Sequence, residues 1–94
     1  MAHDELRREL NALDDLLTEV HENWWASWAR RMSERLAEGC DPAEVRSAFG
    51  GMGSLNDLVI HPVNGHVVEE DSIDTVNARL RAAQSRIFEL SNAR

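Results

Sequence analysis

The stretch LRRELNALDDLLTEVHENWWASWARRMSERL, residues 6–36, decides the fold of this chain. Its apolar side chains recur at every third or fourth position, which is the spacing of one helical face. They are Leu6, Leu10, Leu13, Leu17, Val20, Trp24, Trp28, Met32 and Leu36. Neither Gly nor Pro interrupts the stretch, so one helix of about 50 Å is sterically possible. A domain of this size is only about 25 Å across. We therefore expect a break near His21-Glu22-Asn23 and two antiparallel helices, over about 4–21 and 23–38; one unbroken helix would instead imply a dimer or an extended shape.

A third, short helix is expected over about 42–49. Gly39 ends the preceding helix because it tolerates the left-handed backbone conformation. Asp41 then supplies an N-cap, with Pro42 in the first turn and Glu44 close behind. The glycines of residues 50–53 end this helix and begin a Gly-rich loop over 50–55.

Residues 57–70 are predicted to form a β-hairpin. The pair Asn64-Gly65 is the strongest short-range signal for a two-residue type I′ turn. That register places Leu58, Ile60 and Val67 on one face, which we expect to pack on the helices. The opposite, wetter face carries Asp57, His61, His66 and Glu70.

The last helix is expected over 72–92. Its apolar residues follow a heptad seam: Ile73, Val76, Leu80, Ala83, Ile87 and Leu90. Such a seam suits either the core of a bundle or a dimer interface, and we favour the core. The predicted fold class is therefore mainly α with a small β-hairpin (α+β). It forms a single domain over 1–94, in which three or four helices make a small bundle and the hairpin precedes the last helix.

Composition narrows the functional classes. The chain has 94 residues and a net charge of −7, and its ten bases are all arginine. This charge argues against nucleic acid as a partner. No stretch has the length and apolar character of a membrane span, and the N-terminus shows no signal peptide. A single cysteine cannot form an internal disulfide, so a cytoplasmic location is expected.

The motif Phe49-Gly50-Gly51-Met52-Gly53-Ser54-Leu55-Asn56-Asp57-Leu58 is the least generic part of the chain. We interpret it as structural: the glycines let the loop turn beneath the Trp residues, while Ser54, Asn56 and Asp57 satisfy exposed backbone groups. Phosphate binding is the alternative. However, phosphate loops run from a strand into a helix, whereas this loop leaves a helix, and no Lys follows it.

The same motif resembles the signature of an uncharacterised family of small bacterial proteins, a domain of unknown function. The resemblance covers about residues 24–60 and includes Trp residues on the preceding helix, comparable to Trp24 and Trp28. It implies a shared fold and a bacterial origin, and it transfers no catalytic role.

Single residues give little support for catalysis. His61 and His66 with Asp57 or Glu70 could in principle hold a divalent metal, but solvated hairpin histidines are the simpler interpretation. Cys40 lies beside an acid, which disfavours a thiolate nucleophile. We therefore expect no enzyme activity, no metal and no cofactor.

Two features suggest an interaction surface. Trp24 and Trp28 are expected to anchor the core, whereas Trp25 points about 100° away and is a candidate interface residue. The acids Asp15, Glu19 and Glu22 follow one another at helical spacing, either as a solvated face or as a docking surface for a basic partner.

The leading hypothesis is therefore an acidic protein-interaction domain, such as an immunity or antitoxin-like protein that binds a basic toxin. The alternatives are a homodimer formed through the last helix and, less favoured, phosphate or metal binding at the Gly-rich loop.

Overall fold

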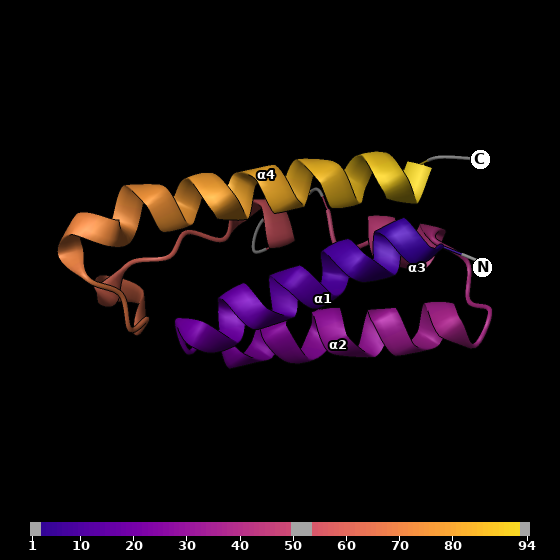
Figure 1. Cartoon of the computed structure of the whole chain (residues 1–94), viewed down its shortest axis with the longest axis horizontal. Coiled ribbons are helices and arrows are strands. Elements are labelled where there is room, and N and C mark those ends of the chain that lie inside the picture. Colours follow the sequence, from indigo (N-terminus) through magenta and orange to yellow (C-terminus); the bar gives the residue numbers. More distant parts are fainter. Residues whose placement is uncertain (1–2, 50–53, 93–94) are drawn as a thin grey trace.

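A computed structural model describes residues 3–49 and 54–92, and within these ranges it contains four α-helices (Figure 1). They are α1 (Asp4–Glu19), α2 (Asn23–Ala37), α3 (Ala43–Arg46) and α4 (Ile73–Asn92). Three short 3-10 helices lie between α3 and α4: η1 (Leu55–Asp57), η2 (Pro62–Asn64) and η3 (Glu70–Ser72). The molecule measures 39 × 23 × 19 Å, and its long axis follows α4.

Helices α1 and α2 form the expected antiparallel pair. The chain turns between them at His21, whose φ of 63° is left-handed. The amide of Glu22 donates to the carbonyl oxygen of Leu17 at 2.8 Å, which closes the last turn of α1. Farther along the pair, the Arg7 guanidinium donates to the Ser33 carbonyl oxygen at 3.0 Å. Two helices folded back on each other bury their apolar faces within a short molecule.

Helix α2 ends in a Schellman motif. Gly39 adopts a φ of 102°, and its amide donates to the Leu36 carbonyl while the amide of Cys40 reaches the Arg35 carbonyl. The carboxylate of Asp41 then accepts from the amide of Ala43 at 2.9 Å, which caps the start of α3. Both features agree with the sequence signals at these positions.

Helix α4 lies along α1 and α3 and completes the core. Leu80 and Ile87, at the centre of the heptad seam, are fully buried. The centre of the seam therefore serves the core of this chain. Among the other elements, α1 contributes the largest share of the core, through its buried residues Leu6, Leu10, Leu13, Leu16 and Leu17.

The predicted β-hairpin is wrong. Over residues 54–72 the structure has three 3-10 helices joined by extended segments, and no β-strand occurs among the described residues. The turn at Asn64-Gly65 does exist, with Gly65 at a φ of 87°. However, it closes η2, where His61 Nδ1 accepts from the amide of Val63 at 3.0 Å.

The arms of this turn do not pair because their backbone groups bond elsewhere. The Asn77 side chain of α4 forms hydrogen bonds with both backbone polar groups of Ile60. Its Oδ1 accepts from the Ile60 amide, and its Nδ2 donates to the Ile60 carbonyl, each at 2.8 Å. His66 Nδ1 accepts from the amide of His61, and the carbonyl of Val20 accepts from the amide of Val67. With these groups occupied by side chains and by the α1–α2 corner, no β-ladder is needed.

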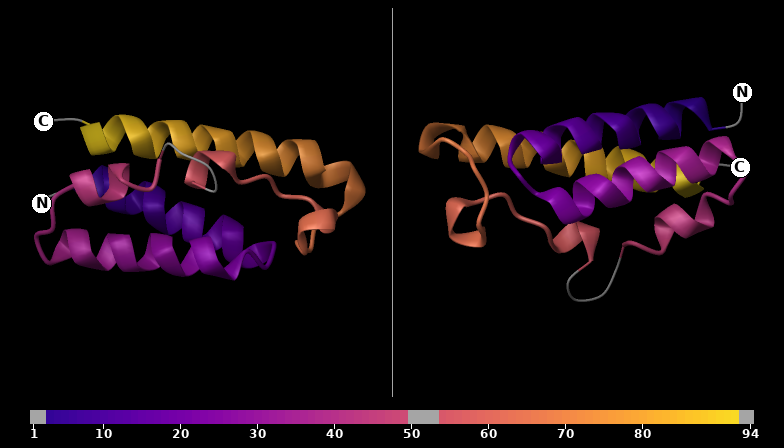
Figure 2. Two further views of the ribbon diagram at one scale, coloured as in Figure 1. Left: turned by 180° about the vertical axis from the view of Figure 1, so that it is seen from behind. Right: turned by 90° about the horizontal axis from the view of Figure 1, so that it is seen from below.

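The predicted division of these residues between a packed face and a solvent face of the hairpin is also wrong. Ile60 is buried as expected, but Val67 is 58% exposed and His66, placed on the wet face, is only 7% exposed. Figure 2 shows the segment over 54–72 running along one side of the bundle, toward the end opposite the termini.

Candidate functional site

His66 connects the segment before α4 to the corner between α1 and α2. Its Nδ1 accepts a hydrogen bond from the His61 amide at 3.1 Å, so the ring proton lies on Nε2. That Nε2 donates to Glu22 Oε1 at 2.9 Å. The second carboxylate oxygen of Glu22 accepts from the amide of Trp25 at 3.3 Å and caps α2. These bonds hold two segments, 44 residues apart in sequence, against each other.

The three acids of the predicted stripe therefore have different environments. Glu22 is largely covered and is occupied by His66 and the α2 cap. Asp15 and Glu19, in the last part of α1, are exposed. Only these two remain accessible to a partner.

The tryptophans differ from expectation. Trp28 is buried as predicted, at 8% exposure, but Trp24 is 66% exposed, so its assignment to the core is wrong. Trp25, the predicted interface residue, is half-buried and contacts both neighbours edge-on, with centroids 4.6 Å from Trp24 and 5.3 Å from Trp28. The reason is the non-helical turn at residues 20–22: α2 restarts there with a new phase, so the apolar stripe of α1 does not continue through Trp24.

Two further apolar side chains are exposed at the same end of the molecule. Val63 is 82% exposed and Val67 is 58% exposed. The bonds from Val67 to Val20 and from His66 to Glu22 hold their segment against the corner from which Trp24 projects. Sequence reasoning assigned none of Trp24, Val63 and Val67 to an interface, since only the tertiary contacts reveal that the three lie exposed at the same end of the molecule.

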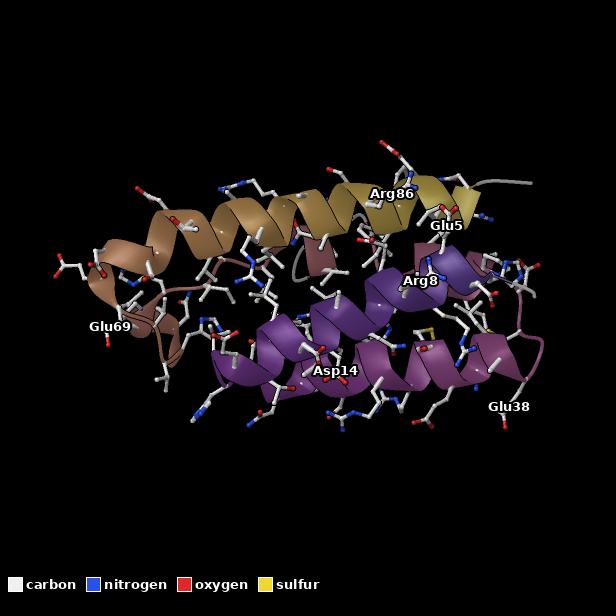
Figure 3. All side chains as sticks on the ribbon, viewed as in Figure 1. Glu5, Arg8, Asp14, Glu38, Glu69 and Arg86 are labelled. Carbon is white, nitrogen blue, oxygen red and sulfur yellow. The ribbon has the colours of Figure 1, made fainter. Side chains whose placement is uncertain are left out.

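Exposed carboxylates lie in the same stretches of the chain as these apolar residues. The sequence has no arginine or lysine in residues 15–29 or in residues 47–78, and the fold brings parts of both stretches together. Besides Asp57 in η1, these two stretches carry six exposed acids: Asp15, Glu19, Glu69, Glu70, Asp71 and Asp74. We call these six acids together with Trp24, Val63 and Val67 the acidic end; Glu69 marks it in Figure 3.

The opposite end of the molecule mixes both charges. There Arg35 forms an ion pair with Glu44 at 2.8 Å, and Arg86 pairs with Glu5 at 3.0 Å. Figure 3 shows Arg86 and Glu5 together with Arg8 near the start of α1. Charge is therefore segregated along the long axis of the molecule.

The described part of the Gly-rich motif packs against α4. Phe49 and Phe88 meet edge-on with centroids 5.3 Å apart, and the amide of Leu55 donates to the Ala48 carbonyl at 2.9 Å. The Ser54 hydroxyl bonds to the Asn56 side chain, and Asp57 ends η1. Residues 50–53, namely Gly50, Gly51, Met52 and Gly53, lie outside the described residues.

Metal-binding groups do not gather in the described part of the chain. No set of three His, Cys, Asp or Glu side chains there could hold a metal ion. Burial, and then a hydrogen bond with Glu44, raises the pKa of the Cys40 thiol, which disfavours the thiolate. His61 and His66 are occupied with the backbone and with Glu22.

The fold and its surface define a small helical domain with one acidic, partly apolar end. The chain belongs to the family described as "Domain of unknown function (DUF6966)", whose profile matches residues 18–69. That span includes α2, the Gly-rich motif and the segment carrying His66. No curated protein and no solved structure matches the chain. Across residues 3–49 and 54–92, none of the helices is both long and apolar enough to cross a bilayer.

Proposed function

We propose that this chain is a protein-interaction domain that binds a basic partner protein through the acidic end. The observation that carries the proposal is that two arginine-free stretches, joined at the α1–α2 corner, carry six exposed acids together with exposed Trp24, Val63 and Val67. Exposed apolar side chains with a polar rim are typical of protein interfaces, and Trp is enriched where interfaces concentrate their energy.

The sign of the charge defines the partner. A surface of carboxylates attracts Arg- and Lys-rich proteins and accelerates their association, whereas it repels the phosphates of nucleic acids. An immunity or antitoxin-like protein that covers a basic toxin, such as a nuclease, is the concrete form of this proposal. The small size and the net charge of −7 support it.

Two double variants with equal changes of charge test the proposal. Glu19→Gln/Glu69→Gln removes two acids from the acidic end, and Glu34→Gln/Glu38→Gln removes two exposed acids elsewhere. The wild-type chain and each variant are immobilised and exposed to an extract of the source cell at low salt and at high salt. Bound proteins are identified by mass spectrometry, and their affinity is then measured with purified material.

We expect a basic protein to bind the wild-type chain and the Glu34/Glu38 variant at low salt. It should bind the Glu19/Glu69 variant at least tenfold more weakly, and salt should weaken the wild-type complex. Trp24→Ser should weaken binding at both salt concentrations because it removes apolar contact rather than charge. Equal binding by the two charge variants, or a partner with an acidic surface, would contradict the proposal.

A further inference from the structure

A second surface feature shares none of its lining residues with the acidic end. An open groove of about 720 Å³ runs between α4 and the segment at Leu58–Val59. Its volume falls within the range of small-molecule sites, which are lined by apolar and aromatic side chains with a few polar groups. This groove has the same composition, and its ligand can be deduced from two parts of its wall.

The first part of the wall is apolar. The edge-on pair Phe49 and Phe88 lies on one side, and Phe88 keeps 45% of its surface exposed. Leu58 and Val59 line the groove from the facing segment. Such a wall is suited to an aromatic or aliphatic body, because aromatic rings gain from edge-on contacts beyond the area they bury.

The second part of the wall is the guanidinium of Arg81. Arg81 is exposed, and it makes no ion pair or hydrogen bond with another side chain or backbone group in residues 3–49 and 54–92. The three amide side chains of the lining are already occupied. Asn77 bonds to the backbone of Ile60, and Gln84 Nε2 donates to the Leu55 carbonyl at 2.7 Å. The side chain of Asn56 accepts from the Ser54 hydroxyl. Arg81 is therefore the charged group that this groove offers, and its planar donors suit a carboxylate.

The spacing of these groups defines a length. Arg81 and Phe88 are seven residues apart on α4, which places them on one side of the helix and about 10 Å apart along its axis. We propose that this groove binds a small amphipathic carboxylate, with its apolar body against Phe49 and Phe88 and its anionic end at Arg81. The groove shares no lining residue with the acidic end, and its anionic ligand is opposite in charge to the basic partner proposed for that end.

The probe for this proposal is 4-phenylbutanoate, titrated into the full chain and followed by backbone-amide NMR. Its uncharged analogue 4-phenylbutan-1-ol tests the anion, and butanoate tests the aromatic body. Arg81→Gln removes the charge in the groove. Arg79→Gln is the matched control, because Arg79 is an exposed arginine of the same helix that lines a different surface, beside α1.

We expect saturable shifts at Val59, Gln84 and Phe88 and none at Trp24 or Val67. The Kd should rise at least tenfold for Arg81→Gln, for the alcohol and for butanoate, and it should change less than twofold for Arg79→Gln. Non-saturable shifts, equal affinity for the alcohol, or an unaffected Arg81→Gln variant would overturn the proposal. Sedimentation of the same samples covers the other occupant: a dimer that the probe dissociates would assign the groove to a second copy and would also overturn it.

Discussion

The two ends of this molecule are held together by different forces. Near the acidic end, segments distant in sequence are joined by hydrogen bonds of buried groups: Asn77 with Ile60, and His66 with Glu22. At the opposite end, exposed ion pairs such as Arg86–Glu5 lie over the contact between α1 and α4. The first arrangement leaves its six surface acids without a base among them, whereas the second pairs carboxylates with arginines.

The difference shows how a small acidic domain can keep charge accessible to a partner. Buried hydrogen bonds stabilise the acidic end without using its surface carboxylates. The cost of losing a buried bond is large because the abandoned partner stays unsatisfied, while an exposed ion pair exchanges readily with water. Mutations at the two ends should therefore differ strongly in their effect on folding.

The largest effect is expected for Asn77→Ala. This change leaves the amide and the carbonyl of buried Ile60 without partners and should lower the free energy of unfolding by about 2–4 kcal/mol. Thr75→Ala, at an exposed position of the same helix, is the control and should change it by less than about 0.5 kcal/mol. Urea unfolding followed by circular dichroism measures both, and equal effects would contradict the role of Asn77 as a buried connection.

The next effect is expected at the pair Glu22 and His66. Each single change to Ala should destabilise the chain by about 1–3 kcal/mol, because the partner is left buried and unpaired. In a double-mutant cycle the two residues should couple by about 0.5–3 kcal/mol. A second double-mutant cycle, between Glu22 and Thr18, is the control. The Thr18 hydroxyl donates to Asp14 and not to Glu22, so we expect no coupling in this cycle. A coupling near zero between Glu22 and His66 would show that their hydrogen bond does not hold the corner.

A smaller effect of opposite sign is expected for Glu19→Gln. Glu19 is the last residue of α1, where a negative charge opposes the helix dipole, and it lies one turn from Asp15. Neutralising it should stabilise the chain by about 0.3–1 kcal/mol at low salt, and high salt should remove the gain. Thermal unfolding at two salt concentrations tests this expectation. A destabilised variant would mean that the acid serves the fold rather than a partner.

At the opposite end, Arg86→Gln should cost less than about 0.5 kcal/mol, since both members of its pair with Glu5 are about half exposed or more. The same urea titration measures this change. A loss as large as that of Asn77→Ala would remove the contrast between the two ends.

The smallest effect concerns pH. The hydrogen bond from Arg35 lowers the pKa of Glu44, followed by a contribution from Cys40. The stabilisation from this pair is fully present above the ordinary pKa of a glutamate and is lost as the pH falls through the lowered value. NMR titration of the Glu44 carboxyl should show a higher pKa in Arg35→Gln than in the wild-type chain. Arg31→Gln, at an exposed arginine of the same helix, should leave it unchanged.

Local signals in the sequence were sufficient for the helices. The apolar spacing predicted α1, α2 and the seam of α4, and the Gly39 and Asp41 signals placed the end of α2 and the start of α3. These features depend on residues within one or two turns of each other, so the chain itself contains the information. The expectation of an uncharacterised family agrees with the match to a domain of unknown function over residues 18–69.

The hairpin and the interaction surface could not be predicted in the same way. Asn64-Gly65 does form a turn, but whether its arms pair depends on which acceptors lie nearby, and here Asn77 and Val20 come from other elements. Likewise, Trp24 follows the apolar stripe in sequence yet is exposed, because the turn before α2 changes the phase of the helix.

The sequence by itself therefore determined a small acidic domain, the presence of its four α-helices and its place in an uncharacterised family. Only the tertiary structure decided that two arginine-free stretches meet at one end and that the Glu22 carboxylate accepts a hydrogen bond from His66. It also decided that Trp24, Val63 and Val67 are exposed together at that end. The physical reason is range: helix periodicity and capping act over a few residues, whereas the acidic end arises from contacts between segments more than 40 residues apart.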